Sequence, residues 1–264
     1  MCGICGCNDQ ESALHDHGKE SLDHKHSHAH SHDSHEENRL FLIEQDILSK
    51  NNKFAEDNRR YFSGQKILAL NLLSSPGSGK TTLLEKTIPA LKNQFNIAVI
   101  EGDQQTDCDA ERIKATGVPV VQINTGKGCH LDAHQVGHAT QKLTVEDKTI
   151  LFIENVGNLV CPSLFDLGES QKIVILSVTE GVDKPLKYPD MFYVANLMII
   201  NKIDLLEYVD FNVEKCIEYA HRINPDLQVI TLSATKNKGL ENWYEWLMNE
   251  HKKLFSVHHH STAF

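Results

Sequence analysis

Residues 67–95 read ILALNLLSSPGSGKTTLLEKTIPALKNQF, in which an apolar run is followed by a glycine-rich turn and then by a helical pattern. A glycine-rich turn between a strand and a helix can wrap its backbone N–H groups around phosphate oxygens, and the N-terminus of the helix favours the same negative charge. This order of elements therefore predicts an α/β protein with a phosphate-binding loop at residues 74–81.

The side chains of this turn fit the phosphates of a nucleotide. Gly77 and Gly79 let backbone amides turn inward around phosphate oxygens. The Lys80 ammonium can then contact the β and γ phosphates, and the Thr81 hydroxyl can ligate Mg²⁺. Ser74 stands where the motif ordinarily has its first glycine, so a residue with a Cβ must fit there. The predicted phosphate and Mg²⁺ contacts are Gly77, Ser78, Gly79, Lys80, Thr81 and Thr82.

Further apolar runs alternate with helical patterns after this stretch. They are rich in Val, Ile and Leu along their whole length, which is typical of strands buried on both faces of a parallel sheet. These runs begin at Asn96, Val118, Thr149, Lys172, Asn196 and Leu227. We expect a mostly parallel central sheet of about seven strands with helices on both faces, and ligands at the carboxyl ends of the strands.

A guanine-specific element follows the apolar run NLMIIN. Asn201, Lys202 and Asp204 form an NKxD sequence. The Asp204 carboxylate can accept hydrogen bonds from guanine N1–H and the N2 amine, which adenine does not offer, and the Lys202 stem can cover the base. Ser233 and Ala234 end the next run, where a backbone amide can bond guanine O6. These residues predict GTP and GDP as ligands, and hence a P-loop NTPase of the G-domain type.

Two acidic strand ends lie between the phosphate loop and the guanine element. Asp103 is predicted to contact the metal or the attacking water, and Glu154 occupies the Walker B position for Mg²⁺, with Gly157 near the γ-phosphate. The usual residue at the position of Glu154 is Asp, so ligation is either direct or through water. The hydrolytic base is left open, because Gln104 and Gln105 can both orient water and a partner subunit can supply a cation. The predicted catalytic residues are Lys80, Asp103 and Glu154.

Charge and composition exclude some classes of protein. The net charge is −10, with 36 acidic against 26 basic residues, which argues against general binding to nucleic acid or to an anionic membrane surface. No apolar run approaches the roughly 20 residues of a membrane span, and the N-terminus MCGICGC lacks the basic start of a secretory signal. We therefore expect a cytoplasmic protein, in which 7 Cys and 16 His indicate metal or thiol chemistry rather than disulfides.

Composition also divides the chain into four parts. Residues 1–37 carry few apolar side chains and a large share of the negative charge, so we predict a flexible metal-binding tail. Residues 38–64 are predicted to form a leading amphipathic helix. The GTPase domain is predicted at residues 65–255, followed by a short C-terminal tail at residues 256–264.

The N-terminal tail holds two candidate metal sites. Three thiols crowd its first seven residues. This cluster suits either square-planar Ni²⁺ or tetrahedral Zn²⁺, and unbound thiols or a redox pair are the alternative. A histidine tract offers interchangeable imidazoles for metal storage, and its alternative is a solvated linker. The thiols are Cys2, Cys5 and Cys7, and the tract includes His24, His26, His28, His30 and His32.

A third candidate metal site lies within the nucleotide-binding body. His130, His134 and His138 recur every four residues and are predicted to share one helical face, with Cys129 at the N-terminus of that helix. Cys161 follows the segment predicted near the γ-phosphate. If Cys161 and Cys129 meet, a metal site there is physically connected to the nucleotide site. For His134 and His138 an exposed helix face is the alternative.

Together these motifs resemble one family, the hydrogenase nickel-incorporation GTPases known as HypB. The resemblance covers nearly the whole chain and is carried by MCGICGC, LNLLSSPGSGKTTLLEKT, IEGDQQT, NTGKGCHLDA, FIENVGNLVCP, LSVTEGVDKPLKYP, MIINKIDLL and LSAT. It implies a G domain of the SIMIBI class that forms a homodimer on binding GTP or metal, and slow Mg²⁺-dependent GTP hydrolysis. It also implies delivery of Ni²⁺ to the [NiFe]-hydrogenase large subunit, together with the small zinc protein HypA.

The same resemblance assigns metal sites. It implies a nickel site at Cys2, Cys5 and Cys7, and a metal site at a dimer interface formed by residues that match Cys129, His130 and Cys161. The choice between Ni²⁺ and Zn²⁺ at each site is left open. The His-rich tail varies within the family, so here it implies additional nickel storage rather than the defining function.

Three other functions are weighed against this reading. A urease-type nickel accessory GTPase shares the phosphate loop, but the N-terminal thiols and GKGCHLDA argue against it. A protein used chiefly for nickel storage or buffering would carry a vestigial G domain, and nickel stoichiometry after deletion of residues 8–37 would reveal it. An ATP-dependent small-molecule kinase is disfavoured by Asp204, which is complementary to guanine.

Overall fold

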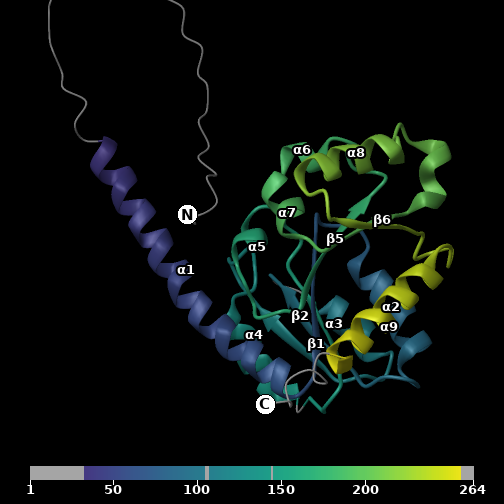
Figure 1. The fold of residues 1–264 in the computed structure, drawn as a ribbon, viewed down its shortest axis with the longest axis horizontal. Helices are drawn as coiled ribbons and strands as arrows, with labels where there is room; N and C mark the ends of the chain where they lie inside the picture. Colours follow the sequence, from purple (N-terminus) through teal and green to yellow (C-terminus); the bar gives the residue numbers. More distant parts are fainter. Residues whose placement is uncertain (1–32, 105–106, 144, 257–264) are drawn as a thin grey trace, which may run out of the picture. The chain divides into compact units, whose positions relative to one another are not determined.

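The structure is a computed structural model, and it describes residues 33–104, 107–143 and 145–256. The chain forms two compact units, one that ends at Ser49 and one that runs from Lys50 onward. The first helix crosses this boundary, and the whole β-sheet belongs to the second unit (Figure 1). The functional site is therefore built by the second unit.

The second unit contains a parallel sheet of seven strands in the order β3-β2-β4-β1-β5-β6-β7. Every neighbouring pair is parallel, so each connection must cross a face of the sheet. The predicted sheet is thus confirmed, and the middle position of β1 places the loop after it at the centre of the carboxyl edge. The strands are β1 Leu68–Ser74, β2 Ile97–Asp103, β3 Val120–Asn124, β4 Ile150–Glu154, β5 Gln171–Ser177, β6 Leu197–Asn201 and β7 Gln228–Thr231.

Helices connect the strands and cover both faces of the sheet (Figure 1). Among the described residues, no helix combines the length and the apolar character needed to cross a membrane. In chain order the helices are α1 Asp33–Gly64, α2 Lys80–Leu91, α3 Cys108–Lys114, α4 Ala133–Leu143, α5 Cys161–Leu164, α6 Lys184–Lys187, α7 Pro189–Val194, the 3₁₀ helix η1 Ile203–Tyr208, α8 Val213–Ile223 and α9 Leu240–Ser256.

Two helix ends differ from the predicted boundaries. α1 begins at Asp33 rather than at Asn38, and α9 includes Ser256, where we placed the start of the C-terminal tail. The first boundary was set by a change in composition, whereas residues 33–38 contain no Pro or Gly that would stop a helix. The functional division into a tail, a helix and a GTPase domain stays a prediction.

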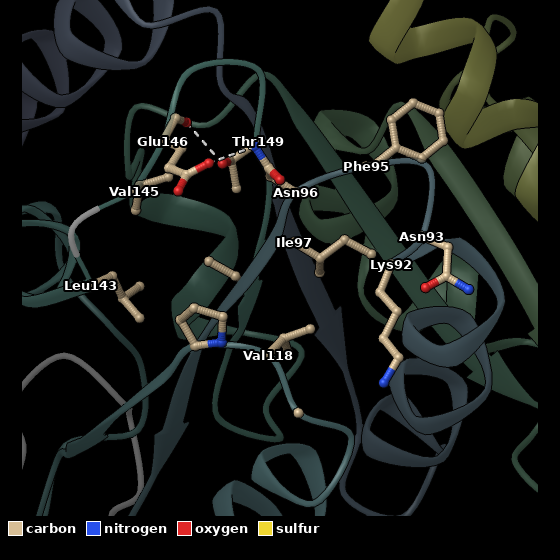
Figure 2. Close-up of a pocket in the computed structure, with 13 residues that line it drawn as sticks. Lys92, Asn93, Phe95, Asn96, Ile97, Val118, Leu143, Val145, Glu146 and Thr149 are labelled. Carbon is tan, nitrogen blue, oxygen red and sulfur yellow. Dashed lines mark hydrogen bonds between the residues drawn. The ribbon is translucent and has the colours of Figure 1, made fainter.

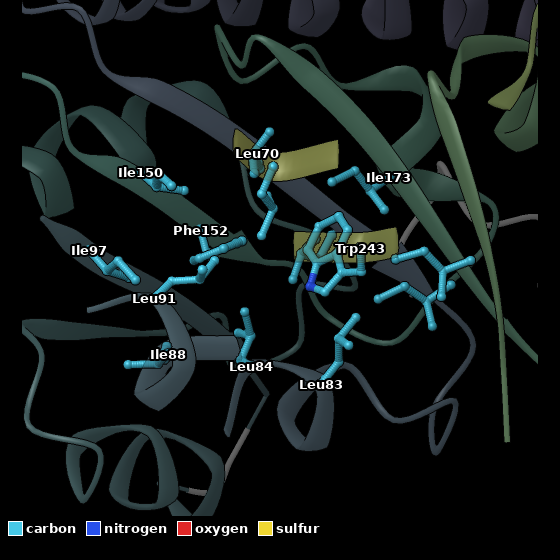
Figure 3. Close-up of a cluster of buried hydrophobic side chains, with 14 of the residues drawn as sticks. Leu70, Leu83, Leu84, Ile88, Leu91, Ile97, Ile150, Phe152, Ile173 and Trp243 are labelled. Carbon is cyan, nitrogen blue, oxygen red and sulfur yellow. The ribbon is translucent and has the colours of Figure 1, made fainter. Parts of the chain in front are cut away.

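Alternate side chains of the central strands pack into two hydrophobic cores, one on each face of the sheet. On one face, Leu70 of β1 packs with residues of α2 and α9, and Trp243 lies among Leu70, Leu83 and Ile173 (Figure 3). On the other face, Leu73 packs with residues of α7 and α8. Burial on both faces explains the continuous apolar runs, and it leaves the strand ends as the place where polar side chains gather.

The C-terminal half of α1 is joined to the start of α4 by buried amide side chains. Asn51 Oδ1 accepts a hydrogen bond from the Ala133 N–H at 2.9 Å, and Asn58 Nδ2 donates to the Ala133 carbonyl at 2.7 Å. Asn58 Nδ2 also donates to the Leu167 carbonyl at 2.9 Å. These bonds satisfy backbone groups at the beginning of α4, so α1 fixes the position of that helix.

Candidate functional site

The phosphate loop joins β1 to α2 at the middle of the strand ends. Gly77 and Gly79 have positive φ angles of 74° and 101°, and a Cβ on Gly79 would come within 2.6 Å of Asn201 Nδ2. Ser74, at the position of the first motif glycine, is buried, and its hydroxyl accepts a hydrogen bond from Lys80 Nζ at 2.9 Å. The departure from the motif thus supplies a partner for the loop lysine.

The NKxD residues hold the phosphate loop from the end of β6. Asn201 Nδ2 donates to the Ser78 carbonyl at 2.9 Å, and Lys202 Nζ donates to the Gly77 carbonyl at 2.6 Å. Asn201 Oδ1 also accepts a hydrogen bond from the Ala234 N–H at 3.1 Å. The predicted phosphate and guanine elements therefore form one connected network, while the predicted contact of Lys202 with the base stays a prediction.

Asp204 lies on η1, two residues after Lys202. Its Oδ1 is buried and has no hydrogen-bond partner among the described residues. A buried acceptor without a partner is unfavourable, and a ligand that offers N–H groups would satisfy it. Ser233 and Ala234 are buried, and the Ala234 N–H is bonded to Asn201. This arrangement suits guanine, whose N1–H and N2 amine are both donors.

Thr81 and Glu154 form the candidate Mg²⁺ side of the site. Thr81 Oγ1 donates to Glu154 Oε1 at 2.7 Å. Glu154 is 3% exposed, and its Oε2 has no hydrogen-bond partner in the described part of the chain. Burial raises the pKa of the Glu154 carboxyl, while Lys80 and Thr81 oppose the rise. A hydroxyl and a buried carboxyl with an unpartnered oxygen are ligands that Mg²⁺ prefers, so these residues fit the ion.

A second buried carboxyl, absent from the predicted site, lies beside Glu154. Glu101 is the register partner of Glu154 in the β2–β4 pair, so the two side chains project from the same face of the sheet. Glu101 is 2% exposed, and burial, together with the charges of Glu154 and Asp103, raises its pKa to about 8. The sequence signal for it is a Glu at the end of the apolar run NIAVIE, where a buried charge requires a specific partner.

These groups line a cleft of about 450 Å³. A Cβ on Gly157 would come within 2.9 Å of Pro76 Cα, so the segment after β4 packs directly against the phosphate loop. Burial lowers the pKa of the Lys80 ammonium, and the carboxylate of Glu154 opposes this effect. The predicted residues that line the cleft are Gly77, Gly79, Lys80, Thr81, Thr82, Asp103, Glu154, Gly157 and Lys202.

A different hollow, of about 310 Å³, lies at the amino ends of β2, β3 and β4 (Figure 2). Its polar groups bond to one another, since Asn96 Nδ2 donates to Glu146 Oε2 at 2.9 Å and Thr149 Oγ1 donates to the Glu146 carbonyl at 2.8 Å. No predicted site residue lines this hollow. It lies at the opposite ends of the strands from the phosphate loop and is not the nucleotide site.

Cys129, His130 and Cys161 come together as a metal-ligand cluster. One ligand atom from each lies within 4.8 Å of the others, and Cys129 Sγ is 3.6 Å from His130 Nδ1. The His130 ring packs on Phe165 with 3.9 Å between ring centroids, and burial lowers the pKa of the imidazole. Two sulfur atoms and a neutral imidazole can hold a borderline ion such as Ni²⁺ or Zn²⁺.

The metal-ligand cluster is connected to both acidic strand ends. Gln104, which lines the nucleotide cleft, donates from Nε2 to the Gly128 carbonyl at 3.3 Å. Asn158 lies between Glu154 and Cys161 in the chain, and its Nδ2 donates to the Cys129 carbonyl at 3.4 Å. The segment that leaves β4 therefore forms part of the nucleotide cleft before it supplies a metal ligand.

The predicted helical face of three histidines is wrong. α4 begins at Ala133, so Cys129 and His130 precede the helix. Asp132 caps it, because Asp132 Oδ1 accepts from the Gln135 N–H at 2.8 Å while Gln135 Oε1 accepts from the Asp132 N–H at 3.1 Å. This capping box is visible in the sequence as Asp followed three residues later by Gln, and it sets the helix start against the four-residue spacing of the histidines.

The remaining histidines of that prediction form a pair on α4. The Nε2 atoms of His134 and His138 are 3.1 Å apart, and the His134 ring packs edge-on against Phe54 of α1. The pair is not part of the three-residue ligand cluster, and its role in metal binding stays a prediction. Gln105 lies outside the described residues. The same holds for the remaining predicted metal ligands, which are Cys2, Cys5, Cys7, His24, His26, His28, His30 and His32.

Comparisons with known proteins point to one family. The family model described as CobW/HypB/UreG, nucleotide-binding domain, matches residues 68–231. Among curated relatives, the hydrogenase maturation factor HypB of Azotobacter vinelandii is 61% identical over 211 residues, which cover 80% of this chain and 70% of that protein.

Two solved structures are similar along most of this chain. HypB from Helicobacter pylori, in a crystal structure with nickel, is 38% identical with a TM-score of 0.73, and the match covers 81% of this chain and 100% of that one. The hydrogenase maturation factor HypB from Archaeoglobus fulgidus is 41% identical with a TM-score of 0.72, over 77% of this chain and 99% of that one.

Replacing Glu101 with Gln should change the pH dependence of stability in the nucleotide-free and metal-free protein. Because the pKa of Glu101 is about 8 in the folded chain and near its ordinary value when unfolded, the folded state alone keeps the proton between these pH values. The free energy of unfolding should therefore fall as pH rises through this range. In Glu101→Gln this component of the fall should disappear.

Urea denaturation at several pH values between about 5 and 8 measures the effect, since the slope depends on the difference in bound protons. Glu111→Gln is the matched control, because Glu111 is exposed on the neighbouring helix α3. Parallel pH profiles for the wild type and Glu101→Gln would show that Glu101 is ionised in the folded chain at neutral pH.

Proposed function

The chain belongs to the HypB group of the CobW/HypB/UreG family of nucleotide-binding proteins, and on this basis we propose that it is a GTP-hydrolysing nickel metallochaperone. Its cargo is Ni²⁺ for the large subunit of [NiFe]-hydrogenase. The observation that carries the proposal is the connection of a nucleotide cleft to a thiol and imidazole cluster through one segment, residues 154–161.

The nucleotide in this proposal is GTP. The buried Asp204 Oδ1 lacks a partner in the described part of the chain, and guanine supplies the donors it needs. The phosphate loop, with Lys80 at the start of α2, is bonded to Asn201, three residues before Asp204. These features support a guanosine phosphate bound from the base to the terminal phosphate.

Hydrolysis in this proposal depends on groups that line the cleft. Lys80 contacts the β and γ phosphates, and Asp103 with Gln104 orients the attacking water. When bound by Thr81 and Glu154, Mg²⁺ supplies positive charge beside the phosphates. Arg112 also lines the cleft, but its guanidinium is held by Glu85 at 2.6 Å and Asp109 at 2.8 Å.

We expect slow GTP turnover by the single chain because Arg112, which lines the cleft, is already paired with Glu85 and Asp109. Rapid GTP hydrolysis depends on a cation that stabilises the charge of the transition state, such as an arginine supplied by a partner. Arg112 is already paired, and Lys80 is the only cation of the phosphate loop itself. A second copy of the chain, in the homodimer that we propose forms with GTP or metal, is the expected source of further stabilisation.

Nickel transfer is the second half of the proposal. Cys129, His130 and Cys161 offer three ligands in one cluster, which leaves coordination positions open for an incoming or departing ligand.

Further nickel sites are part of the proposal. Cys2, Cys5 and Cys7 are proposed to form a further nickel site, the tract from His24 to His32 to store nickel, and His134 with His138 to add ligands. A HypA-type zinc protein and the hydrogenase large subunit are the proposed partners, in the cytoplasm.

The two halves are proposed to be thermodynamically linked. If GTP favours one arrangement of residues 154–161, and metal bound by Cys161 favours the same or the opposing one, each ligand changes the affinity of the other. The effect must be reciprocal, because linkage between two binding equilibria is symmetric. Hydrolysis then resets the affinity for nickel.

Asp204→Asn tests the assignment of the base. The substitution removes a carboxylate that accepts two guanine donors, and losing such bonds should weaken GTP binding roughly 10- to 100-fold. Xanthosine triphosphate, which presents an acceptor in place of the N2 amine, should bind better to the variant than to the wild type. Equilibrium titration with fluorescent nucleotides measures both affinities, with the exposed Asp210→Asn as control. Unchanged GTP affinity would rule out Asp204 as the guanine acceptor.

Calorimetric titration of Ni²⁺ tests the linkage. In the presence of GDP and of a non-hydrolysable GTP analogue, the wild type should show Ni²⁺ affinities that differ by roughly 5-fold or more. The nucleotide-dependent part should vanish in Cys129→Ala, which removes one ligand of the cluster. Identical affinities and stoichiometries in the two nucleotide states would remove the linkage from the proposal.

A further inference from the structure

Asn155 directly follows Glu154, the last residue of β4, and both the oxygen and the nitrogen of its side-chain amide form hydrogen bonds. It is 1% exposed. Its Oδ1 accepts from the N–H of Leu131 at 3.1 Å and from the N–H of Val156 at 3.0 Å. Its Nδ2 donates to Asn71 Oδ1 at 3.2 Å. One amide side chain thus joins the segment after β4, the loop before α4 and the central strand β1.

The hydrogen bond between the Leu131 N–H and Asn155 lies one residue after His130, a member of the metal-ligand cluster. Leu131 follows His130, and its side chain is fully buried. A Cβ built on Gly102 would come within 2.8 Å of the Leu131 side chain, so Leu131 packs directly on Gly102 near the end of β2, on the opposite face of the strand from Glu101 and Asp103. The loop that carries Cys129 and His130 is therefore held against both acidic strand ends at the position of Leu131.

The bond to Asn71 anchors Asn155 in the sheet. Asn71 Nδ2 donates to Glu169 Oε1 at 3.0 Å. The Glu169 carboxylate also accepts from the Leu167 N–H at 2.6 Å and pairs with Lys172 at 3.0 Å. All of these groups belong to β1 or to the chain that enters β5. Asn155 thus lies between a fixed buried network and a loop that contains metal ligands.

A second, weaker bond runs in parallel. Asn158 Nδ2 donates to the Cys129 carbonyl at 3.4 Å, and Asn158 forms an isolated antiparallel bridge with Ser74 of the phosphate loop. Asn155 and Asn158 therefore fasten the same loop at two points. Both belong to the segment between Glu154, which contacts Thr81, and Cys161, which is a member of the metal-ligand cluster.

We propose that Asn155 is a positioning residue that makes nickel affinity depend on the bound nucleotide. Through Leu131 it holds Cys129 and His130 against the segment that carries Cys161, so the three ligands keep their spacing only while that segment holds its position. A change of nucleotide that moves residues 154–157 breaks or strains this bond and separates the ligands. The inference rests on the proposed function, because it assigns a residue to the linkage between GTP and Ni²⁺.

An amide is required at this position for a physical reason. The Leu131 N–H needs an acceptor, while Asn71 Oδ1 needs a donor. Asn supplies both from one planar group, whereas Ala supplies neither and would leave buried polar groups without partners. Asn155→Ala therefore removes both bonds and leaves the ligands themselves in the chain.

The test compares Ni²⁺ affinities of the full chain with GDP and with a non-hydrolysable GTP analogue, by competition with a chelating indicator. Binding to the cluster is the part that Cys129→Ala removes. The wild type should give a ratio of affinities of roughly 5 or more. Asn155→Ala should bring this ratio to about one, and Asn158→Ala, at a partly exposed site, should lower it less.

Asn51→Ala is the matched control. Asn51 is also a buried amide, and its Oδ1 accepts from the Ala133 N–H, two residues beyond Leu131, but it belongs to α1 rather than to the nucleotide segment. Its loss should weaken Ni²⁺ binding equally in both nucleotide states and leave the ratio intact. A purely structural role of Asn155 would give the same result as Asn51→Ala, and the ratio separates the two.

Each outcome decides the inference. If Asn155→Ala keeps the wild-type ratio, Asn155 does not transmit the nucleotide state, while the proposed linkage stands. If the wild type itself gives a ratio of one, both the linkage and this inference are overturned. Should Asn155→Ala fail to fold, Asn158→Ala decides: a lowered ratio supports the inference, and an unchanged ratio overturns it.

Discussion

Glu101, near the end of β2, and Glu154, at the end of β4, lie side by side. Two adjacent buried carboxyl groups are costly unless a cation or a proton neutralises their charge. Lys80 supplies one cation, but its ammonium is itself buried and bonded to Ser74. Burial raises the pKa values of both carboxyls, which favours proton uptake there when no further cation is bound. The carboxyl edge of the sheet is therefore suited to bind a cation together with a nucleotide.

The parallel topology connects this charge to the metal-ligand cluster. Because β1 lies in the middle of the sheet with β4 beside it, the segment leaving β4 must pass the phosphate loop. The close approach of Gly157 to Pro76 marks that passage. The same segment then begins α5 with Cys161. In the proposed linkage, a ligand that moves this segment beside the phosphate loop also moves Cys161, without a separate signalling element.

Local patterns in the sequence predicted most of this architecture, because each strand and the phosphate loop are encoded within a few neighbouring residues. The cluster of Cys129, His130 and Cys161 was expected as a set from the family resemblance, and the structure brings the three residues together. The predicted start of α4 is wrong, because the four-residue spacing of the histidines indicated an earlier start than the one that the capping box at Asp132 sets. Glu101 and Asn155 belong to the two predicted acidic strand ends but were given no role of their own, because their importance comes from neighbours across strands and loops, which sequence spacing does not reveal.

Amide hydrogen exchange tests most directly whether the nucleotide cleft and the metal-ligand cluster share one connected segment. The account predicts that a GTP analogue and GDP give the metal-free protein different exchange rates at the Leu131 N–H, which bonds to Asn155. It also predicts that Ni²⁺, added without nucleotide, changes exchange in residues 155–158. If each ligand altered exchange only among the residues that contact it, the two sites would be independent and the account would be contradicted.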